Sequence, residues 1–246
     1  MKNINKLRKK IDLIDNKILS LLKSRSKLAI EIGGLKKINS EEMNLFRPER
    51  QAEILKRLFS KRNDLLKELD IFKFWRQVFL HQTSLQGKLE FLIPQTLRNT
   101  EKEIIHYSFG IDIHMNVFED INKAFSVAKK KNNILIILPY PGKLIATSWW
   151  LKRSFKNLFI IAAVPFILKK KVLPRLVIIS KNKPILKGEH SFIYKSSSEQ
   201  NKYNLKKIAQ LRNNYLYTSN ILLNNKKLKI LGAYPNLNSN ENEKNK

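Results

Sequence analysis

The most informative residue for chemistry is Arg25, because it lies where a hydrophobic side chain is expected. Apolar residues recur at alternating steps of three and four along the first segment, forming a seam at Leu7, Ile11, Ile14, Ile18, Leu21, Leu28 and Ile32. Arg25 occupies one position of this seam. Burying an unpaired charge is costly, and no carboxylate lies three or four residues away on either side. Arg25 therefore needs an anion, either from another segment or from a ligand.

Three more polar residues share this pattern. Gln82 and Gln86 extend the apolar stripe of a later helix, where both could simply be solvated near the helix end. Lys36 lies three turns after Arg25 on nearly the same face, although a cation near a helix C-terminus is common by itself. Two cations and two amides could converge on one pocket, which suits a small, oxygen-rich anion.

This set of side chains restricts the chemistry. No His, Cys or paired carboxylate joins it, so acid, base and nucleophilic catalysis are not supported. An enzyme built on these residues has to orient its substrate and stabilise developing charge with preorganised donors.

Long helices must position these residues. The first is predicted over Ile4–Lys37, about 50 Å long, followed by a loop over Asn39–Asn44. A second helix is expected to open at Pro48, and Asn63 or Asp64 can cap a third. The sequence changes character near Gly87, so residues 1–87 are predicted to form an all-helical domain.

Residues 88–235 alternate short β-branched runs with helical stretches, which predicts a mixed α/β domain. Strands are expected at Leu89–Ile93, Ile111–Val117, Ile134–Leu138, Leu158–Val164, Leu176–Ser180, Ser191–Tyr194, Tyr215–Leu223 and Leu228–Gly232. Helices are expected near Glu101–Tyr107, Asp120–Lys130, Leu144–Phe155 and Asn204–Arg212. Residues 236–246 lack apolar content and are predicted to be a disordered tail.

The composition bounds the function classes. A net charge of +28 could indicate nucleic acid or an anionic membrane surface as partner, but the excess is spread over both halves in a chain rich in Lys, Asn and Ile. Neither partner is therefore expected. The chain has no Cys, and its four His show no metal-like spacing, so no metal is predicted; the seven glycines form no phosphate-binding loop, so no cofactor is predicted. No signal or membrane-spanning segment is recognised, and a cytoplasmic location is expected.

Three motifs in order resemble the all-helical chorismate mutases: LRKKIDLIDNKILSLLKSRSKLAIEIGGLK, FRPERQAEIL and FWRQVFLHQTSLQ, covering about residues 4–86. The resemblance implies a three-helix domain, in an intertwined homodimer, that converts chorismate to prephenate by a cofactor-free Claisen rearrangement. This reaction belongs to phenylalanine and tyrosine biosynthesis. Its dicarboxylate substrate agrees with the anion pocket inferred from the residues.

The resemblance also assigns residue roles. It implies that Arg25 binds one substrate carboxylate and that Arg8 of a second subunit binds the other. Lys36 and Gln86 match the donors to the ether oxygen, where negative charge grows as the C–O bond breaks. By itself, Arg8 could equally belong to a solvated basic cluster with Lys9 and Lys10.

Three further positions depart from the family pattern. Gln82 falls where many relatives have Ser beside a carboxylate, and an amide N–H can serve there. Gln51 falls where a Glu usually accepts a hydrogen bond from the substrate hydroxyl, so weakened rather than abolished activity is expected. Arg47 occupies a position that is Asp in some relatives, and its role stays open.

The helix geometry favours a second subunit. Arg8 and Arg25 are 17 residues apart, about 25 Å along one helix, so a ligand some 10 Å long cannot touch both within one chain. Two antiparallel long helices would bring Arg8 of one subunit to Arg25 and Lys36 of the other, and would also cover the seam.

The second half bears a fainter resemblance to the prephenate dehydratase region of bifunctional enzymes, which ends in an ACT-like module. It is carried by HYSFGIDIHMNVFEDINKAFSVAKKKNNILIILPYP and PRLVIISKNKPILKGEHSFIYKSSS. The family's Thr-Arg-Phe motif is replaced by Pro174-Arg175-Leu176, and its Glu-Asn-Ser loop by Tyr140-Pro141-Gly142-Lys143. A catalytically inactive domain with a structural or regulatory role is therefore expected. The alternatives are a bifunctional mutase/dehydratase and a relative that binds a metabolite without turning it over.

Overall fold

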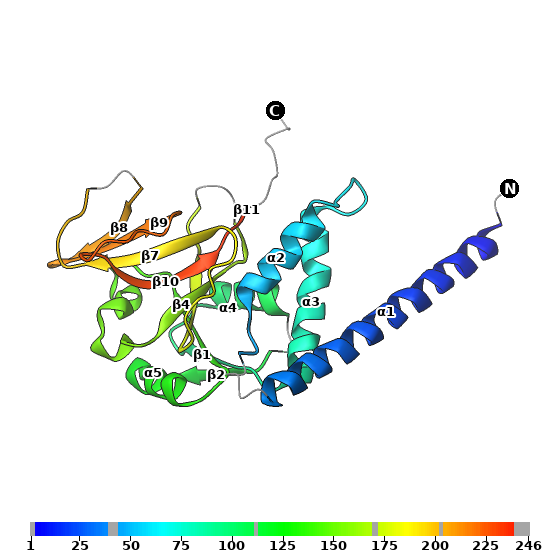
Figure 1. The fold of residues 1–246 in the computed structure, drawn as a ribbon, viewed down its shortest axis with the longest axis horizontal. Coiled ribbons are helices and arrows are strands. Elements are labelled where there is room, and N and C mark those ends of the chain that lie inside the picture. Colours follow the sequence, from blue (N-terminus) through cyan, green and yellow to red (C-terminus); the bar gives the residue numbers. More distant parts are fainter. Residues whose placement is uncertain (1–2, 39–43, 111–112, 169–171, 202–203, 239–246) are drawn as a thin grey trace.

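The computed structural model describes residues 3–38, 44–110, 113–168, 172–201 and 204–238 (Figure 1). The helical half contains α1 (Ile4–Ile38), α2 (Pro48–Phe59) and α3 (Glu68–Gln86). The remainder contains, in order, β1 (Glu90–Pro94), α4 (Asn99–Phe109), β2 (Met115–Phe118), α5 (Ile121–Lys130), β3 (Ile134–Pro139), the 3-10 helices η1 (Ile145–Leu151) and η2 (Arg153–Phe155), β4 (Phe159–Val164), β5 (Ile167–Leu168), β6 (Leu176–Ser180), β7 (His190–Ser196), β8 (Lys206–Leu211), β9 (Asn214–Ser219), β10 (Lys229–Pro235) and β11 (Leu237–Asn238). The predicted order, helices followed by a mixed α/β domain, is confirmed.

The helical half is a long rod with a helical hairpin beside one end. Figure 1 shows α1 extending away from the rest of the molecule toward its N-terminus, while α2 and α3 lie side by side. Pro48 begins α2, where its missing N–H is not needed. The predicted cap of α3 was wrong: this helix follows Lys67, whose backbone N–H donates to Asp70. The Asn63 side chain instead accepts from the backbone of Leu65 and Leu66 in the preceding turn.

A nine-stranded mixed sheet organises the second half, in the order β2-β1-β3-β6-β4-β10-β7-β9-β8. Strands β2, β1 and β3 are parallel, and β6 runs antiparallel between β3 and β4. Gly232 lies at a bulge in β10, where a Cβ atom would stand 2.1 Å from the carbonyl oxygen of Ile160. This close approach explains why a glycine is needed to join β10 to β4.

Helices cover both faces of the sheet. Phe125 of α5 and Trp149 of η1 pack on one face, and Ile105 and Phe109 of α4 pack on the other. The central strands are buried on both sides, which matches the near-continuous apolar runs in their sequences.

The two halves share buried apolar clusters. Phe46, just before α2, is 2% exposed and belongs to the apolar cluster of the sheet. Leu55 and Phe59 of α2 are buried in a cluster that also contains Leu237 of β11. Residues 237 and 238, which were predicted to be part of a disordered tail, instead form β11 and pair with β5. Residues 239–246, the rest of that predicted tail, lie outside the described part.

Two predicted helices of the second half were wrong. Leu144–Phe155 forms the short 3-10 helices η1 and η2, with the two Trp indoles donating to backbone carbonyls. Asn204–Arg212 contains strand β8, which pairs with β9 through a turn at Arg212, where φ is 51°. None of the described helices is both long and apolar enough to span a bilayer.

Candidate active site

Arg25 lies where α1 meets α3. Its side chain is half-buried, and its guanidinium carbon stands 5.9 Å from the centre of the Phe79 ring of α3. Within the described part of the chain, Arg25 forms no ion pair. A stacked, partly desolvated cation without a carboxylate is ready to receive an anion from outside these residues.

Arg50, in the first turn of α2, is a second cation that the sequence reasoning missed. Burial lowers the pKa of Arg25 from its ordinary value, and the positive charge of Arg50 lowers it further. Arg50 also pairs with exposed Glu53 at 2.7 Å. The sequence did contain a signal for Arg50, because this residue directly precedes the candidate site residue Gln51 on the same helical turn. The Glu53 carboxylate offsets part of the repulsion between Arg25 and Arg50, and the net positive charge of the three groups favours an anion near Arg25.

Gln82 is held by a chain of two hydrogen bonds. The Ser26 hydroxyl donates its proton to the Leu22 carbonyl at 2.9 Å, so Ser26 can only accept from Gln82, whose amide nitrogen lies 2.9 Å away. Gln82 is 5% exposed, so it is not a solvated residue at the helix end. Its amide oxygen has no hydrogen-bond partner among the described residues. The amide of Gln82 is thus fixed against the part of α1 that carries Arg25, since Ser26 directly follows Arg25 in the chain.

Gln86 and Lys36 lie close to the same helix contact. Gly33 of α1 packs against Gln86, since a Cβ atom at this glycine would be 3.2 Å from Cγ of Gln86. The Gln86 amide nitrogen donates weakly to the Gln82 carbonyl at 3.4 Å. Lys36 is half-buried one turn beyond Gly33 on α1. Arg25, Gln82 and Gln86 therefore all lie at the α1–α3 contact, with Lys36 near its end.

Arg47 and Gln51 are engaged elsewhere. Arg47 forms an ion pair with Glu49, which is buried. Gln51 is half-buried and lines a small cavity of about 30 Å³ between α2, α3 and the sheet, together with Thr83 and Phe109. This cavity is large enough for one or two water molecules only. It is therefore not a site for a dicarboxylate.

Arg8 stands apart from the cluster in this single chain. It is exposed on the protruding part of α1, which is one unbroken helix of 35 residues. The separation of about 25 Å from Arg25 along the helix therefore holds, and the two cannot grip one small ligand from the same chain.

The apolar surface beside the cluster is unusually exposed. Along the seam, Ile11, Ile14, Ile18 and Leu21 are 50–70% exposed. The facing corner of the α2–α3 hairpin also exposes Leu65, at 88%. Figure 1 shows an open angle between α1 and α3, which meet near their C-terminal ends. An apolar helix face of this extent is typical of a surface that packs against another element.

The two segments that replace dehydratase motifs lie side by side at the ends of β3 and β6. Arg175 is exposed before β6, and its carbonyl accepts from the backbone of Tyr140, which follows β3. Burial raises the pKa of the Tyr140 hydroxyl well above its ordinary value. Tyr140 therefore stays protonated at neutral pH.

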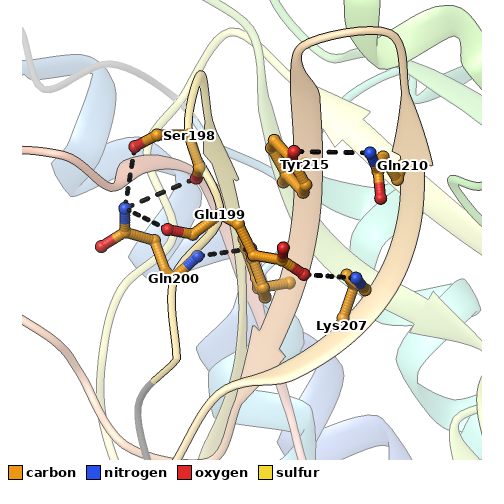
Figure 2. A network of polar contacts seen from close by, with 7 residues as sticks. Ser198, Glu199, Gln200, Lys207, Gln210 and Tyr215 are labelled. Carbon is orange, nitrogen blue, oxygen red and sulfur yellow. Dashed lines mark hydrogen bonds and ion pairs between the residues drawn. The ribbon is translucent and has the colours of Figure 1, made fainter.

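Surface polar contacts in this half hold loops rather than form a pocket. Figure 2 shows Glu199 paired with Lys207 of β8, and Gln200 bonded to the loop around Ser198. The backbone N–H of Gln200 also donates to the Tyr217 hydroxyl at 2.8 Å. These contacts tie the segment after β7 onto the β8–β9 hairpin.

Comparison with solved structures returns distant similarities. A prephenate dehydratase from Streptococcus mutans aligns with 61% of this chain and 100% of its own, at 10% identity and a TM-score of 0.39. A structure described as GqqA, a novel type of quorum quenching acylase, aligns with 61% of this chain and 96% of its own, at 11% identity and a TM-score of 0.41. No curated protein matches the chain significantly. Residues 7–87, which include Arg8, all of α2 and α3 and the Arg25 cluster, match the family model of chorismate mutase type II.

Proposed function

We propose that the helical half is a cofactor-free chorismate mutase whose two active sites are each completed by a second copy of the chain. The observation that carries this proposal is Arg25, half-buried and without an ion-pair partner in the described part of the chain, inside a segment that matches the mutase family model. Chorismate carries two carboxylates, and Arg25 offers a positive site for one of them, to which Arg50 adds charge although it also pairs with Glu53.

Catalysis then depends on donors that meet charge developing during bond cleavage. Lys36 and Gln86 are assigned to the ether oxygen of the substrate, where negative charge grows as the C–O bond breaks. Gln82 is assigned to a carboxylate and Gln51 to the substrate hydroxyl, as the resemblance implies. Because Gln51 lines a separate small cavity, its contribution is expected to be the weakest of the set.

The second subunit supplies Arg8 and covers the seam. Antiparallel pairing of two α1 helices places Arg8 of each subunit near Arg25 of the other, and buries apolar residues that are 50–70% exposed in one chain. The α/β half is proposed to lack dehydratase activity, since both replaced motifs depart from that chemistry.

Mixing two inactive variants tests the site and the dimer together. Arg8→Ala and Arg25→Ala are each expected to lose chorismate turnover, which is followed by the disappearance of chorismate absorbance. After the two are unfolded and refolded together, half of the dimers are mixed, and each mixed dimer has one intact site. Because half of the dimers then have one of their two sites intact, recovery of about a quarter of the wild-type activity is expected. No recovery would mean that Arg8 and Arg25 act within one chain or not at all.

Wild-type protein that binds chorismate but does not convert it would instead support a metabolite-binding relative. Formation of phenylpyruvate from prephenate would support the bifunctional alternative.

A further inference from the structure

We propose that the α/β domain positions the arginine-bearing end of α2, and so sets the substrate affinity of the mutase site. Asn133, 88 residues away from Leu45 in sequence, is the positioning residue for this end of the helix. The inference rests on the proposed mutase function and adds a role for the second half of the chain.

The first step is a hydrogen bond between the halves. The backbone N–H of Leu45 donates to the Asn133 side-chain oxygen at 3.1 Å. Asn133 lies in the turn between α5 and β3 with φ at 58°, a left-handed conformation that Asn tolerates better than most residues. Its own carbonyl accepts from the backbone N–H of Glu90 at the start of β1. One residue of the α/β domain therefore holds both the first strand and the segment that enters α2.

The second step is the burial of the next residue. The centre of the Phe46 ring lies 5.8 Å from the centre of the Phe109 ring of α4. It lies 6.4 Å from the centre of the ring of Phe166, a residue in the link from β4 to β5. At 2% exposure, Phe46 is a core residue of the α/β domain although it belongs to the segment that matches the mutase model. The entry to α2 is thus fixed to the sheet by a hydrogen bond and by packing.

The far end of α2 is fixed to the same domain. Lys56 pairs with Glu189, just before β7, at 3.0 Å. Leu55 packs in the cluster that contains Leu237. Since α2 is held along its length, the α/β domain determines where its first turn stands relative to α1.

The third step connects this turn with the substrate. Arg50 is five residues after Leu45 and next to Gln51, which lines the small cavity together with Phe79, the ring that lies against Arg25. Burial lowers the pKa of Arg25, and the charge of Arg50 lowers it further. Displacing the start of α2 changes the spacing of two guanidinium groups that receive the same carboxylate. This carboxylate is bound in the ground state and in the transition state alike, so its loss raises KM and leaves kcat nearly unchanged. Lys36 and Gln86, which are on other helices, keep their roles in the transition state.

Three single variants of the full-length protein test the inference. Asn133→Gly keeps the left-handed backbone accessible and removes the bond to Leu45. Asn133→Asp retains an acceptor oxygen at the same place. Asn157→Gly is the matched control, because Asn157 also has a positive φ, 67°, in the same domain and is exposed at the turn before β4.

The readouts are KM and kcat for chorismate, with dimer content and melting temperature measured in parallel. Asn133→Gly is expected to raise KM about three- to tenfold with kcat within about twofold of wild type, as the loss of one hydrogen bond predicts. Asn133→Asp and Asn157→Gly are expected to keep the wild-type KM.

Two outcomes overturn the inference. An unchanged KM in Asn133→Gly would show that the α/β domain does not set substrate affinity through this contact. A fall in kcat in proportion to lost stability, with KM unchanged, would show a structural role only. A wild-type protein without mutase activity would contradict the proposed function itself, which is a separate result.

Discussion

Helix α1 and the central strands of the sheet are both apolar, but their surroundings differ completely. Ile136 of β3 and Ile178 of β6 are fully buried by their own chain, whereas Ile14 and Leu21 of α1 are 55% and 70% exposed. At about 25 cal/mol per Å² of apolar surface, leaving a long seam in water forgoes several kcal/mol. The sheet is covered by its own chain, while the seam of α1 stays open within that chain and is covered only in the proposed dimer.

The largest expected effect concerns the charge on α1. Arg25→Ala and Lys36→Ala are each expected to lower kcat/KM for chorismate at least about 100-fold. The Arg25 variant should act mainly by raising KM, because it loses a donor to a carboxylate, and the Lys36 variant mainly by lowering kcat, because it loses a donor to the ether oxygen. Size-exclusion chromatography is expected to show that the dimer persists in both. Lys27→Ala, an exposed cation on the same helix, serves as the control and should turn over normally. Near-normal rates in Arg25→Ala would refute the site.

The second-largest effect is expected from a charge placed on the seam of α1, because this surface, unlike the sheet, is proposed to pack against a second subunit. Ile14→Glu is expected to dissociate the dimer and abolish turnover, because an unpaired carboxylate at a helix–helix interface is costly. Asn16→Glu, on the opposite side of the helix, is the control and should remain dimeric. Sedimentation velocity measures both, and circular dichroism should show a preserved sheet. Ile14→Glu remaining dimeric would contradict the pairing of α1 with its copy.

A substitution in the sheet tests the opposite prediction, that this region depends on contacts within one chain. Gly232→Ala places a Cβ atom 2.1 Å from the Ile160 carbonyl, so it is expected to cost about 3 kcal/mol or more of unfolding free energy. Gly188→Ala has the same kind of positive φ but open space around it, and should cost about 1 kcal/mol. Urea unfolding measures the difference, and equal losses would show that strain in φ alone matters.

The smallest effect concerns Glu101 at the start of α4. Burial by itself raises the pKa of this carboxyl, but the hydrogen bonds from the side chain and backbone of Arg98 outweigh it, so the pKa lies below the ordinary value. A lowered folded-state pKa gives stability that is present above the unfolded value and lost as the pH falls through the folded value. Glu101→Gln should therefore lower unfolding free energy by about 0.5–1 kcal/mol at pH 7 and by less at pH 3. An equal loss at both values would contradict this account.

The helical half could be predicted well from sequence because its signals are local. The three-four spacing placed α1 within one residue at its C-terminus, and Pro48 marked the start of α2. The polar residues at apolar positions of two helices, Arg25 and Gln82, indicated a polar patch at a helix contact, and both lie where α1 meets α3.

The contacts that join the halves could not be predicted in this way. Phe46 reads as an ordinary apolar residue of a loop, and nothing in its neighbourhood indicates that its partners are Phe109 and Phe166. Arg50 was missed because its approach to Arg25 depends on where α2 is anchored. Strand β8 was mistaken for a helix because its hairpin turn at Arg212 lacks the usual glycine.

The burial of Phe46 also has a consequence during protein synthesis. Helix α2 leaves the ribosome early, but its anchoring ring packs among β4 and β6, which emerge more than a hundred residues later. The apolar side chains of the first helices therefore stay exposed to solvent during much of translation, until β4 and β6 have been synthesised and α2 can pack against them. A nascent chain of this kind is a natural client for chaperones that shield apolar helices.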